Sequence, residues 1–365
     1  MEYDRFERIE NDRLRVICVR FEPDADFAPG DTLVGKAYFA GDTVVSVEDF
    51  SIAYLHQYDQ NHSFPDERTI TLIDSTLWLP DSMQFRYKIP EDVFLKEKVQ
   101  GDVDSATIKR IVDVFSLYDG PLESLPDIIG VATLDSLLLV ISNIYARPSI
   151  FFNAHSTSGS VLKVRSEFIV RYNTLLSPYL PVNHNPIIKW MNVYKVPYKS
   201  ADSFNPNKLK LREKYFLTYL YNTDTPESVS TTIEIDTGFA YFISCNKGIE
   251  TYVTSSGDTI KDTTCDIVNS LSGKPLPEEY EYKWFFQNSD NVDEEPDSLL
   301  LLNFGDSGPG YIRMKLPVFT DMKHFKIWVV VHDNAPEEWS RPKGYTMCTV
   351  EGSFEYTDAY VKSVK

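Results

Sequence analysis

Short runs of alternating apolar and polar residues, separated by Pro, Gly, Asp and Asn, restrict the fold of this chain more than any other feature. Residues 160–172 show the alternation best. One face of an extended chain would carry Leu162, Val164, Phe168, Val170 and Tyr172, and the opposite face Lys163, Arg165, Glu167 and Arg171. This period of two is typical of an antiparallel strand with one buried and one solvated face.

Similar alternation predicts strands along most of the chain, over residues 13–21, 32–40, 47–57, 68–73, 83–89, 148–155, 187–195, 230–244, 281–287, 310–317, 324–332 and 345–356. Many short strands separated by turn residues indicate a β-sandwich or a barrel. The 365 residues are too many for one ordinary sandwich and suffice for two domains, each with its own core. Because 13% of the residues are aromatic, disorder over most of the chain is excluded.

Two segments break the strand pattern. Residues 105–117 carry apolar side chains at helical spacing behind the capping candidates Asp104 and Ser105, which predicts an amphipathic helix. Residues 134–145 are apolar on nearly every side, so a buried helix and a buried strand both remain open. We therefore predict a mainly helical insertion at about 91–147, between strands of the first sandwich.

A cluster of prolines and asparagines at residues 176–186 marks the expected domain boundary. The predicted organisation is an N-terminal tail (1–10), a first sandwich (11–178), a linker (179–186) and a second sandwich (187–365). An acidic stretch from Asp290 to Asp297 interrupts the second sandwich and is interpreted as a solvated loop.

Three stretches together resemble a known family. Residues 15–23 (RVICVRFEP) and 28–37 (APGDTLVGKA) are similar to the first two strands of immunoglobulin-like (Ig-like) domains in bacterial cell-surface lipoproteins, joined by a Pro-Gly-Asp turn. Residues 182–186 (VNHNP) resemble the short linker before the next such domain, and residues 325–339 resemble the penultimate strand and turn of PKD-like domains.

The resemblance implies two tandem Ig-like β-sandwiches in a mainly β protein, the second of them PKD-like. It also implies a location in the cell envelope, outer membrane-associated or extracellular, with a lipid anchor on the native N-terminus. The first five residues, from Met1 to Arg5, lack the basic and apolar regions of a signal peptide. We expect that an export segment was removed, with a cytoplasmic protein as the alternative.

The net charge of the chain limits the classes of partner that it can bind. The formal net charge is −18, so the protein repels phosphate backbones, and we expect no nucleic-acid partner. No stretch approaches the roughly 20 apolar residues that a membrane-spanning helix requires, so no transmembrane segment is predicted.

The familiar catalytic and metal-binding motifs are absent from the sequence. There is no nucleophile elbow, phosphate-binding loop or zinc-ligand pair of histidines, and we expect no enzyme activity and no cofactor. His56 and His62 fit no specific metal motif, and His332 is interpreted as a solvated loop residue. Calcium is a candidate ligand for the acidic loops at Asp24 to Asp26, Asp290 to Asp297 and Asp333, although none has EF-hand spacing.

Four cysteines, Cys18, Cys245, Cys265 and Cys348, form no C-x-x-C pair. We expect most of them to be small buried core residues. Their even number also permits disulfides, for which Cys245 with Cys265 or with Cys348 is the first candidate pair.

Tryptophans are the candidate contact residues. Trp78 and Trp339 lie beside prolines in predicted loops, which favours exposure and contact with a partner or a glycan. Trp284 and Trp328 lie within predicted strands, where core packing is the usual role of a tryptophan.

Three functions follow from these observations. The leading hypothesis is a non-enzymatic protein-interaction or structural module in the cell envelope, because loops on rigid β-scaffolds commonly bind partners. The alternatives are a carbohydrate-binding surface protein and a glycan-active enzyme with an unrecognised carboxylate pair. An interaction module predicts exposed apolar residues, for which the 105–145 segment is the candidate.

Overall fold

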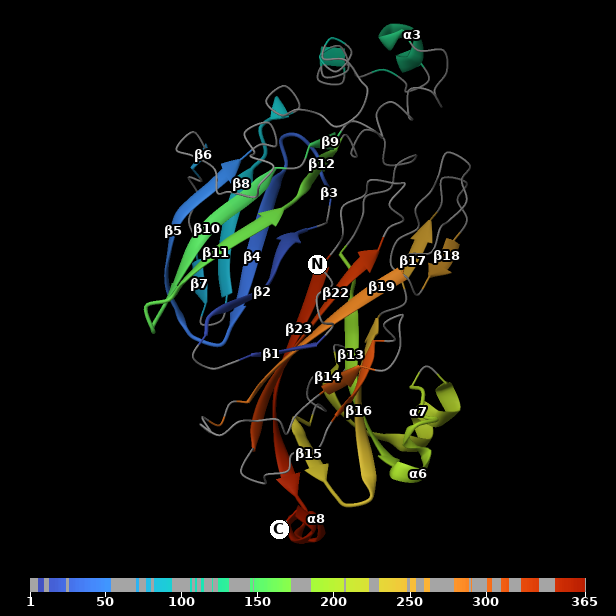
Figure 1. Cartoon of the computed structure of the whole chain (residues 1–365). Helices are drawn as coiled ribbons and strands as arrows, with labels where there is room; N and C mark the ends of the chain where they lie inside the picture. The colour runs from blue at the N-terminus through green and yellow to red at the C-terminus, as the bar shows by residue number, and fades with distance from the viewer. Residues whose placement is uncertain are drawn as a thin grey trace.

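The chain folds mainly as β-strands in the computed structural model (Figure 1). The structure describes residues 6–9, 13–23, 26–53, 70–71, 77–79, 82–93, 106, 109, 113–114, 120, 124–130, 145–146, 148–171, 185–206, 208–222, 230–247, 250–253, 259–262, 279–288, 290, 301–303, 310–314, 323–334 and 345–364.

In the described residues, the N-terminal part of the chain contains two larger sheets and a small one. One sheet has the order β2-β4-β8-β7, formed by β2 (Arg15–Glu22), β4 (Thr32–Ala40), β8 (Ser82–Lys88) and β7 (Leu77–Leu79). The second has the order β11-β10-β5-β6, formed by β11 (Val161–Glu167), β10 (Ser149–Ser156), β5 (Val44–Ala53) and β6 (Ile70–Thr71). The small sheet joins β3 (Asp26–Phe27), β12 (Ile169–Arg171) and β9 (Tyr145–Ala146).

The core of the N-terminal part receives side chains from both larger sheets. Leu33 on β4 and Phe85 on β8 contribute from one sheet, and Ile52 on β5 and Phe152 on β10 contribute from the other. These side chains are buried because alternate residues of each strand point inward, as the period of two requires.

In the described residues, the C-terminal part contains two larger sheets and a separate hairpin. One sheet has the order β1-β19-β22-β23-β15, formed by β1 (Phe6–Ile9), β19 (Glu279–Asn288), β22 (His324–Asn334), β23 (Tyr345–Tyr356) and β15 (Thr232–Ile235). The other has the order β14-β13-β16-β21-β20, formed by β14 (Phe216–Asn222), β13 (Ile188–Pro197), β16 (Phe239–Lys247), β21 (Tyr311–Met314) and β20 (Leu301–Asn303). The hairpin pairs β17 (Glu250–Val253) with β18 (Thr259–Asp262).

A second core lies between the two C-terminal sheets. Met191 on β13 and Ile243 on β16 contribute from one sheet, and Trp284 on β19 and Ile327 on β22 contribute from the other. Trp284 is fully buried, which confirms its predicted role in core packing.

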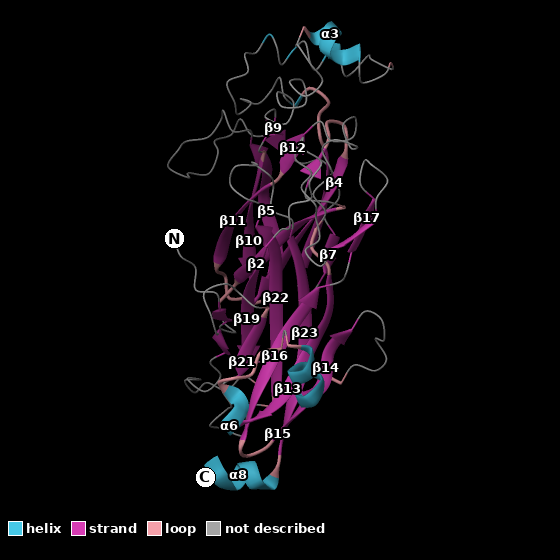
Figure 2. Cartoon of the chain, turned by 90° about the vertical axis from the view of Figure 1, so that its right-hand side faces the viewer, coloured by secondary structure: helices cyan, strands magenta, loops and turns pink. Residues whose placement is uncertain are grey.

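Four short helices lie among the described residues: α3 (Leu125–Ile129), α6 (Tyr198–Ala201), α7 (Leu209–Tyr215) and α8 (Asp358–Val364). Helix α3 ends at Gly130, whose φ of 84° lies in the left-handed region that favours glycine. In Figures 1 and 2, α3 and α8 lie at opposite ends of the elongated molecule. Apart from α3 and β9, most of the predicted helical insertion at 91–147 lies outside the described residues.

The first described residues belong to the C-terminal part of the fold. Residues 6–9, which the sequence places in a tail, form β1 and pair in parallel with β19, from Phe6 opposite Trp284 to Ile9 opposite Gln287. The chain then enters the N-terminal sheets at β2. The start of the chain therefore connects the two parts through backbone pairing.

A third group of buried side chains joins the two parts, and we call it the junction cluster. It comprises Ile17 on β2, Ala40 on β4, Phe285 on β19, and Trp328 and Val330 on β22. Trp328 is only 2% exposed. Burying one large side chain contributes about 2–3 kcal/mol, so the cluster stabilises the contact between the two parts substantially.

Polar and sulfur contacts surround the junction cluster. The Lys326 ammonium lies 5.3 Å from the centre of the Trp328 ring and 3.0 Å from a carboxylate oxygen of Glu351. The Cys18 thiol lies 3.9 Å from the Met347 sulfur. These contacts extend the junction across β2, β22 and β23.

Asn185 fixes the segment between the two parts. Its side-chain amide donates hydrogen bonds to the backbone oxygens of Phe21, at 2.8 Å, and Pro23, at 3.3 Å. Asn185 is buried, so these bonds satisfy an amide that would otherwise destabilise the fold. The end of the predicted linker is thus attached to the end of β2.

Most of the predicted strands overlap strands of the structure, but the single strand predicted at 230–244 is wrong, because a turn at Gly238 divides it into β15 and β16, which belong to different sheets. The predictions 32–40 and 345–356 coincide with β4 and β23, and the Pro-Gly-Asp turn connects strands that pair antiparallel as expected. The predicted strand 160–172 is interrupted at Phe168, between β11 and β12, but its apolar face is the buried one.

Gly35 provides a test of core packing in the N-terminal part. A Cβ atom at Gly35 would lie 2.0 Å from the ring of the fully buried Phe85. We expect Gly35→Ala to lower the free energy of unfolding by about 2 kcal/mol or more, measured by urea denaturation. The double variant Gly35→Ala/Phe85→Leu should lose less than the sum of the two single variants, because the smaller side chain makes room. Additive losses would contradict this explanation.

Trp328 and Trp284 form a matched pair for testing the junction. We expect Trp328→Ala to cost about 3–5 kcal/mol and to separate one calorimetric unfolding transition into two, because it removes the largest side chain of the junction cluster. Trp284→Ala, which removes a large side chain from the C-terminal core, should lower the stability but keep a single unfolding transition. The same single transition in both variants would show that the junction does not couple the two parts.

Candidate functional site

The structure does not describe the side chain of either predicted contact tryptophan. The predicted loop at Trp78 is wrong, because Trp78 lies on β7 and its backbone pairs with Met83; its side chain is outside the described set. Trp339 lies entirely outside the described residues. Contact of either ring with a partner or a glycan therefore stays a prediction.

Each described histidine lies beside a carboxylate. His155 Nε2 is 3.5 Å from Glu48, His324 Nδ1 is 2.6 Å from Asp290, and His332 Nε2 is 3.0 Å from Glu281. His332 is a correction to the sequence interpretation, because it lies within β22 and is mostly buried rather than in a solvated loop. His56 and His62 lie outside the described residues.

Asp290 opens the acidic stretch that was a calcium candidate. Its carboxylate accepts hydrogen bonds from the His324 ring and from the backbone N–H groups of Lys323 and His324. Partial burial raises the pKa of Asp290, but these hydrogen bonds outweigh burial and lower it overall. Asp290 therefore anchors the start of β22. Among the described residues, no group of three or more His, Cys, Asp or Glu side chains could hold a metal ion.

Cys245 and Cys348 contribute to the same core as free thiols. The expected Cys245–Cys348 disulfide is therefore wrong, and Cys265 lies outside the described residues. Both cysteines are buried in the C-terminal core, and the Cys348 thiol lies 4.0 Å from the backbone oxygen of Thr349. Burial raises the pKa of the Cys18 and Cys348 thiols to about 12, which suppresses thiolate reactivity.

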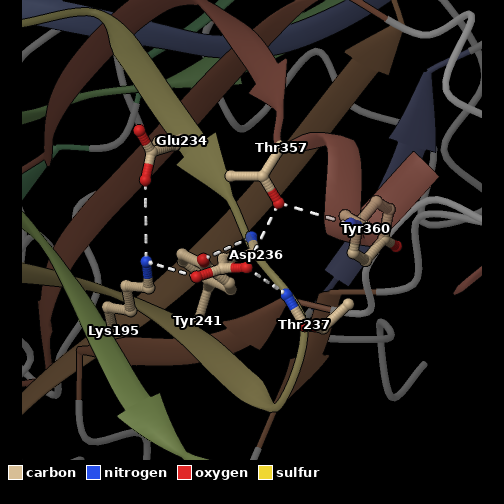
Figure 3. Close-up of polar contacts among 7 residues, drawn as sticks. All are labelled: Lys195, Glu234, Asp236, Thr237, Tyr241, Thr357 and Tyr360. Atoms are coloured by element: carbon tan, nitrogen blue, oxygen red, sulfur yellow. Dashed lines mark hydrogen bonds and ion pairs between the residues drawn. The ribbon is translucent and has the colours of Figure 1, made fainter. Parts of the chain in front are cut away.

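Figure 3 shows a group of interacting polar side chains beside α8, which we call the Asp236 cluster. It comprises Lys195, Glu234, Asp236, Thr237, Tyr241, Thr357 and Tyr360. These residues come from β13, β15, the turn between β15 and β16, β16, and α8 with the residue before it, so the cluster joins both C-terminal sheets to the last helix.

Asp236 is at the centre of this cluster. Its carboxylate accepts hydrogen bonds from the Thr237 N–H at 2.8 Å, the Thr357 hydroxyl at 3.1 Å and the Lys195 ammonium at 3.4 Å. Its own N–H donates to the Tyr241 hydroxyl at 2.9 Å. One side chain thus connects a turn, a strand and a helix.

Thr357 caps α8. Its hydroxyl accepts a hydrogen bond from the N–H of Tyr360 at 3.3 Å, three residues further along, while it donates to Asp236. This is the geometry of an N-cap threonine, which satisfies one of the free N–H groups at the start of a helix. The sequence analysis missed this cap, although a threonine directly before Asp358 is a recognisable signal for a helix start.

The electrostatics of the Asp236 cluster indicate a structural role. The Thr237 N–H and the Thr357 and Lys195 contacts lower the pKa of Asp236 against the effect of burial. Burial raises the pKa of Tyr360 to about 12 and also raises that of Tyr241. The carboxylate therefore stays charged and both phenols stay neutral at neutral pH, whereas a general acid or base is poised near the working pH.

A second polar group lies buried on β13 and β16. The Asn192 amide donates to the Tyr194 hydroxyl at 3.0 Å, and the Ser244 hydroxyl donates to the same oxygen at 3.2 Å. All three residues are buried, so these bonds offset part of the cost of removing the groups from water, while the Asn192 Oδ1 atom has no hydrogen-bond partner in the described part of the chain. They hold the sheet surface beneath α6 and α7.

Large exposed apolar side chains occur at several separate places among the described residues. They are Val45, Ile128, Val161, Ile187, Tyr198 and Phe216. Ile128 lies on α3 within the predicted insertion and is 48% exposed, whereas Leu125 and Ile129 of the same helix are buried. The described part of the insertion is therefore only partly covered.

No helix in the described part of the chain combines the length and the apolar character needed to cross a membrane.

Comparison with known proteins assigns no family. No protein-family model matches the sequence, and no curated protein matches it. One solved structure aligned with it is that of the protocadherin gamma B7 extracellular cadherin domains 1–4, with 9% identity, 94% of this chain and 51% of that chain covered, and a TM-score of 0.15. The Dpr2 Ig1–Ig2 complex with DIP-Theta Ig1–Ig3 aligns with 8% identity, 93% of this chain and 99% of that chain covered, and a TM-score of 0.15. The collagen adhesin of S. aureus aligns with 7% identity, 95% of this chain and 94% of that chain covered, and a TM-score of 0.10. The chain spans about half the length of the protocadherin structure. TM-scores this low carry no argument about fold or function.

The depressed pKa of Asp236 predicts an acid-dependent stability. Because the folded state binds this proton less readily than the unfolded state, the stabilisation is present above about pH 4 and is lost as the pH falls through the lower folded pKa. We expect Asp236→Asn to be less stable than the unmodified protein at neutral pH. Its free energy of unfolding, measured by urea denaturation, should fall less steeply between about pH 5 and pH 2.

Glu355→Gln, on the exposed face of β23, is the control for removal of one negative charge. Its free energy of unfolding should change with pH as steeply as that of the unmodified protein. A slope for Asp236→Asn equal to that of the unmodified protein would contradict the assigned role of Asp236.

Proposed function

We propose that this chain is a non-enzymatic protein-interaction module, built from two Ig-like β-sandwiches that act as one rigid scaffold. The first sandwich would span residues 11–178 with its insertion at 91–147, the linker residues 179–186, and the second, PKD-like sandwich residues 187–365. The two separate cores support this division, because one ends at Val170 and the other begins at Ile188.

The junction cluster is the observation that carries the proposal. It buries Phe285 and Trp328 between the two parts, while β1 and Asn185 connect the same parts through backbone and side-chain hydrogen bonds. A scaffold held in this way presents the exposed residues of both sandwiches in a constant arrangement. Pre-organisation of this kind reduces the entropic cost of binding a partner.

The proposed location is the cell envelope or the extracellular space, with a lipid anchor on the native N-terminus, as the lipoprotein resemblance implies. Burial of the Cys18, Cys245 and Cys348 thiols is compatible with an oxidising compartment, because a buried thiol with a raised pKa resists oxidation. The proposed partner is another protein of the envelope or the cell surface.

Site-specific crosslinking in the native cell tests this function. A photo-reactive amino acid introduced at Val45, Ile128 or Phe216, all exposed apolar positions, should give a discrete adduct with a protein from at least one position. The partner, once identified by mass spectrometry and purified, should form a saturable complex with the purified chain in light-scattering chromatography.

Exposed polar positions provide the control. The same amino acid at Glu355 or Lys362 should give weaker adducts or none, since these exposed residues lie on β23 and α8, whereas the three apolar positions lie on β5, α3 and β14. The proposal is overturned if no position yields a protein adduct while the purified chain binds an oligosaccharide or turns over a glycan.

A further inference from the structure

A basic segment stands out in this acidic protein. Residues 198–216 hold five basic residues (Lys199, Lys208, Lys210, Arg212 and Lys214) and two acidic ones (Asp202 and Glu213), whereas the whole chain holds 36 basic and 54 acidic residues. Asp202 already pairs with Arg313 of β21, at 3.2 Å. All four lysines are exposed. We call residues 198–215, which include α6 and α7, the basic platform.

Aromatic packing fixes the basic platform to the sheet. Phe204, in the loop between the two helices, is buried against Tyr194 on β13 and Phe242 on β16, with ring centres 5.3 Å and 4.8 Å away. The ring of Tyr215 on α7 lies 5.8 Å from that of Phe204. The lysines therefore project from an ordered surface, on the flank of the C-terminal part in Figure 1.

Positive charge is concentrated where α6 meets α7. The Lys214 ammonium lies 5.0 Å from the centre of the Tyr215 ring. The Ser200 and Lys214 contacts and the charges of Lys214 and Lys199 lower the pKa of Tyr215. Both lysines thus act on one small area, which favours a carboxylate or another anion there.

The strand that follows the platform is the last of its sheet among the described residues. β14 pairs with β13 on one side, with two irregularities in its register. Its first residue, Phe216, is 40% exposed, and the Phe216 ring lies 4.7 Å from that of Tyr219. An edge strand presents backbone N–H and C=O groups that can pair with another extended chain.

We propose that β14 and the basic platform together bind an extended acidic segment of a protein partner, which adds to the sheet as a strand beside β14. The platform lysines pair with its carboxylates, and the Phe216–Tyr219 pair contacts its apolar side chains. Strand addition of this kind takes its affinity from main-chain hydrogen bonds and its specificity from alternate side chains. The inference rests on the proposed function and names the partner's chemistry.

Two observations favour an acidic peptide over an anionic membrane. The edge of β14 that faces no partner strand among the described residues supplies hydrogen bonds that match an extended chain, whereas a lipid surface cannot use them. A membrane would also face a large area of a protein whose net charge is −18, while a peptide meets only the local positive surface.

Fluorescence anisotropy with a synthetic probe tests the proposal. The probe is a labelled peptide of about eight residues that alternates Glu with Val, long enough to pair with the seven residues of β14. We expect saturable binding that weakens as salt rises from about 50 to 300 mM. The double variant Lys199→Glu/Lys214→Glu should bind the peptide about tenfold more weakly.

Matched controls separate charge, backbone pairing and folding. The double variant Lys163→Glu/Lys362→Glu, at exposed lysines of β11 and α8, changes the net charge equally and should keep the affinity within about twofold. A probe with lysine in place of glutamate, and an acidic probe with alternate backbone N-methyl groups, should not bind. Unchanged thermal unfolding of both variants would show that folding is intact.

Three results overturn the inference. They are equal loss of binding in the two double variants, full binding of the N-methylated probe, and lysine-dependent binding to phosphatidylserine vesicles without binding to the peptide. If the crosslinked partner binds both double variants equally, this inference fails and the proposed function stands. If no protein partner exists, the proposed function fails whatever the peptide does.

Discussion

Packing of β19 and β22 against β2 and β4 is the interaction on which the arrangement of the whole molecule depends. The two C-terminal strands are buried on both faces: Trp284 and Ile327 point into the C-terminal core, while Phe285 and Trp328 point into the junction cluster. Without the junction, large aromatic side chains would be exposed to water. The hydrophobic effect therefore holds the two parts together, as it also holds each core.

Polar contacts fix the geometry of this arrangement, but hydrophobic packing is what holds it together. Asn185 fixes the connecting segment to the end of β2, and the Asp236 cluster fixes α8 to both C-terminal sheets. In both places a buried or partly buried polar group finds its partners within the protein, which removes a desolvation cost. Such contacts select one geometry among several that hydrophobic packing alone would permit.

The chain is acidic overall, but its basic platform is locally positive, so the surface differs from one place to another in the charge that it can attract. The overall negative charge repels other anionic surfaces, while the lysines around Tyr215 form a local positive area next to β14, the last strand of its sheet among the described residues. The proposed function and the proposed acidic segment both rely on a scaffold that keeps this site in place. The Phe204 contacts and the junction cluster supply that rigidity.

The alternation of residues along the chain determined most of the strands, since the period of two is a local property of any half-buried strand. It predicted β4 and β23 to the residue, the turn at Gly30, and the burial of Trp284. Only the tertiary structure decided that residues 6–9 pair with β19, that Trp328 packs between the two parts, and that Cys245 and Cys348 stay unbonded. It likewise decided that the lysines of α6 and α7 meet beside β14. These outcomes depend on which distant surfaces come together, and hydrophobic pattern along one strand carries no information about its partner.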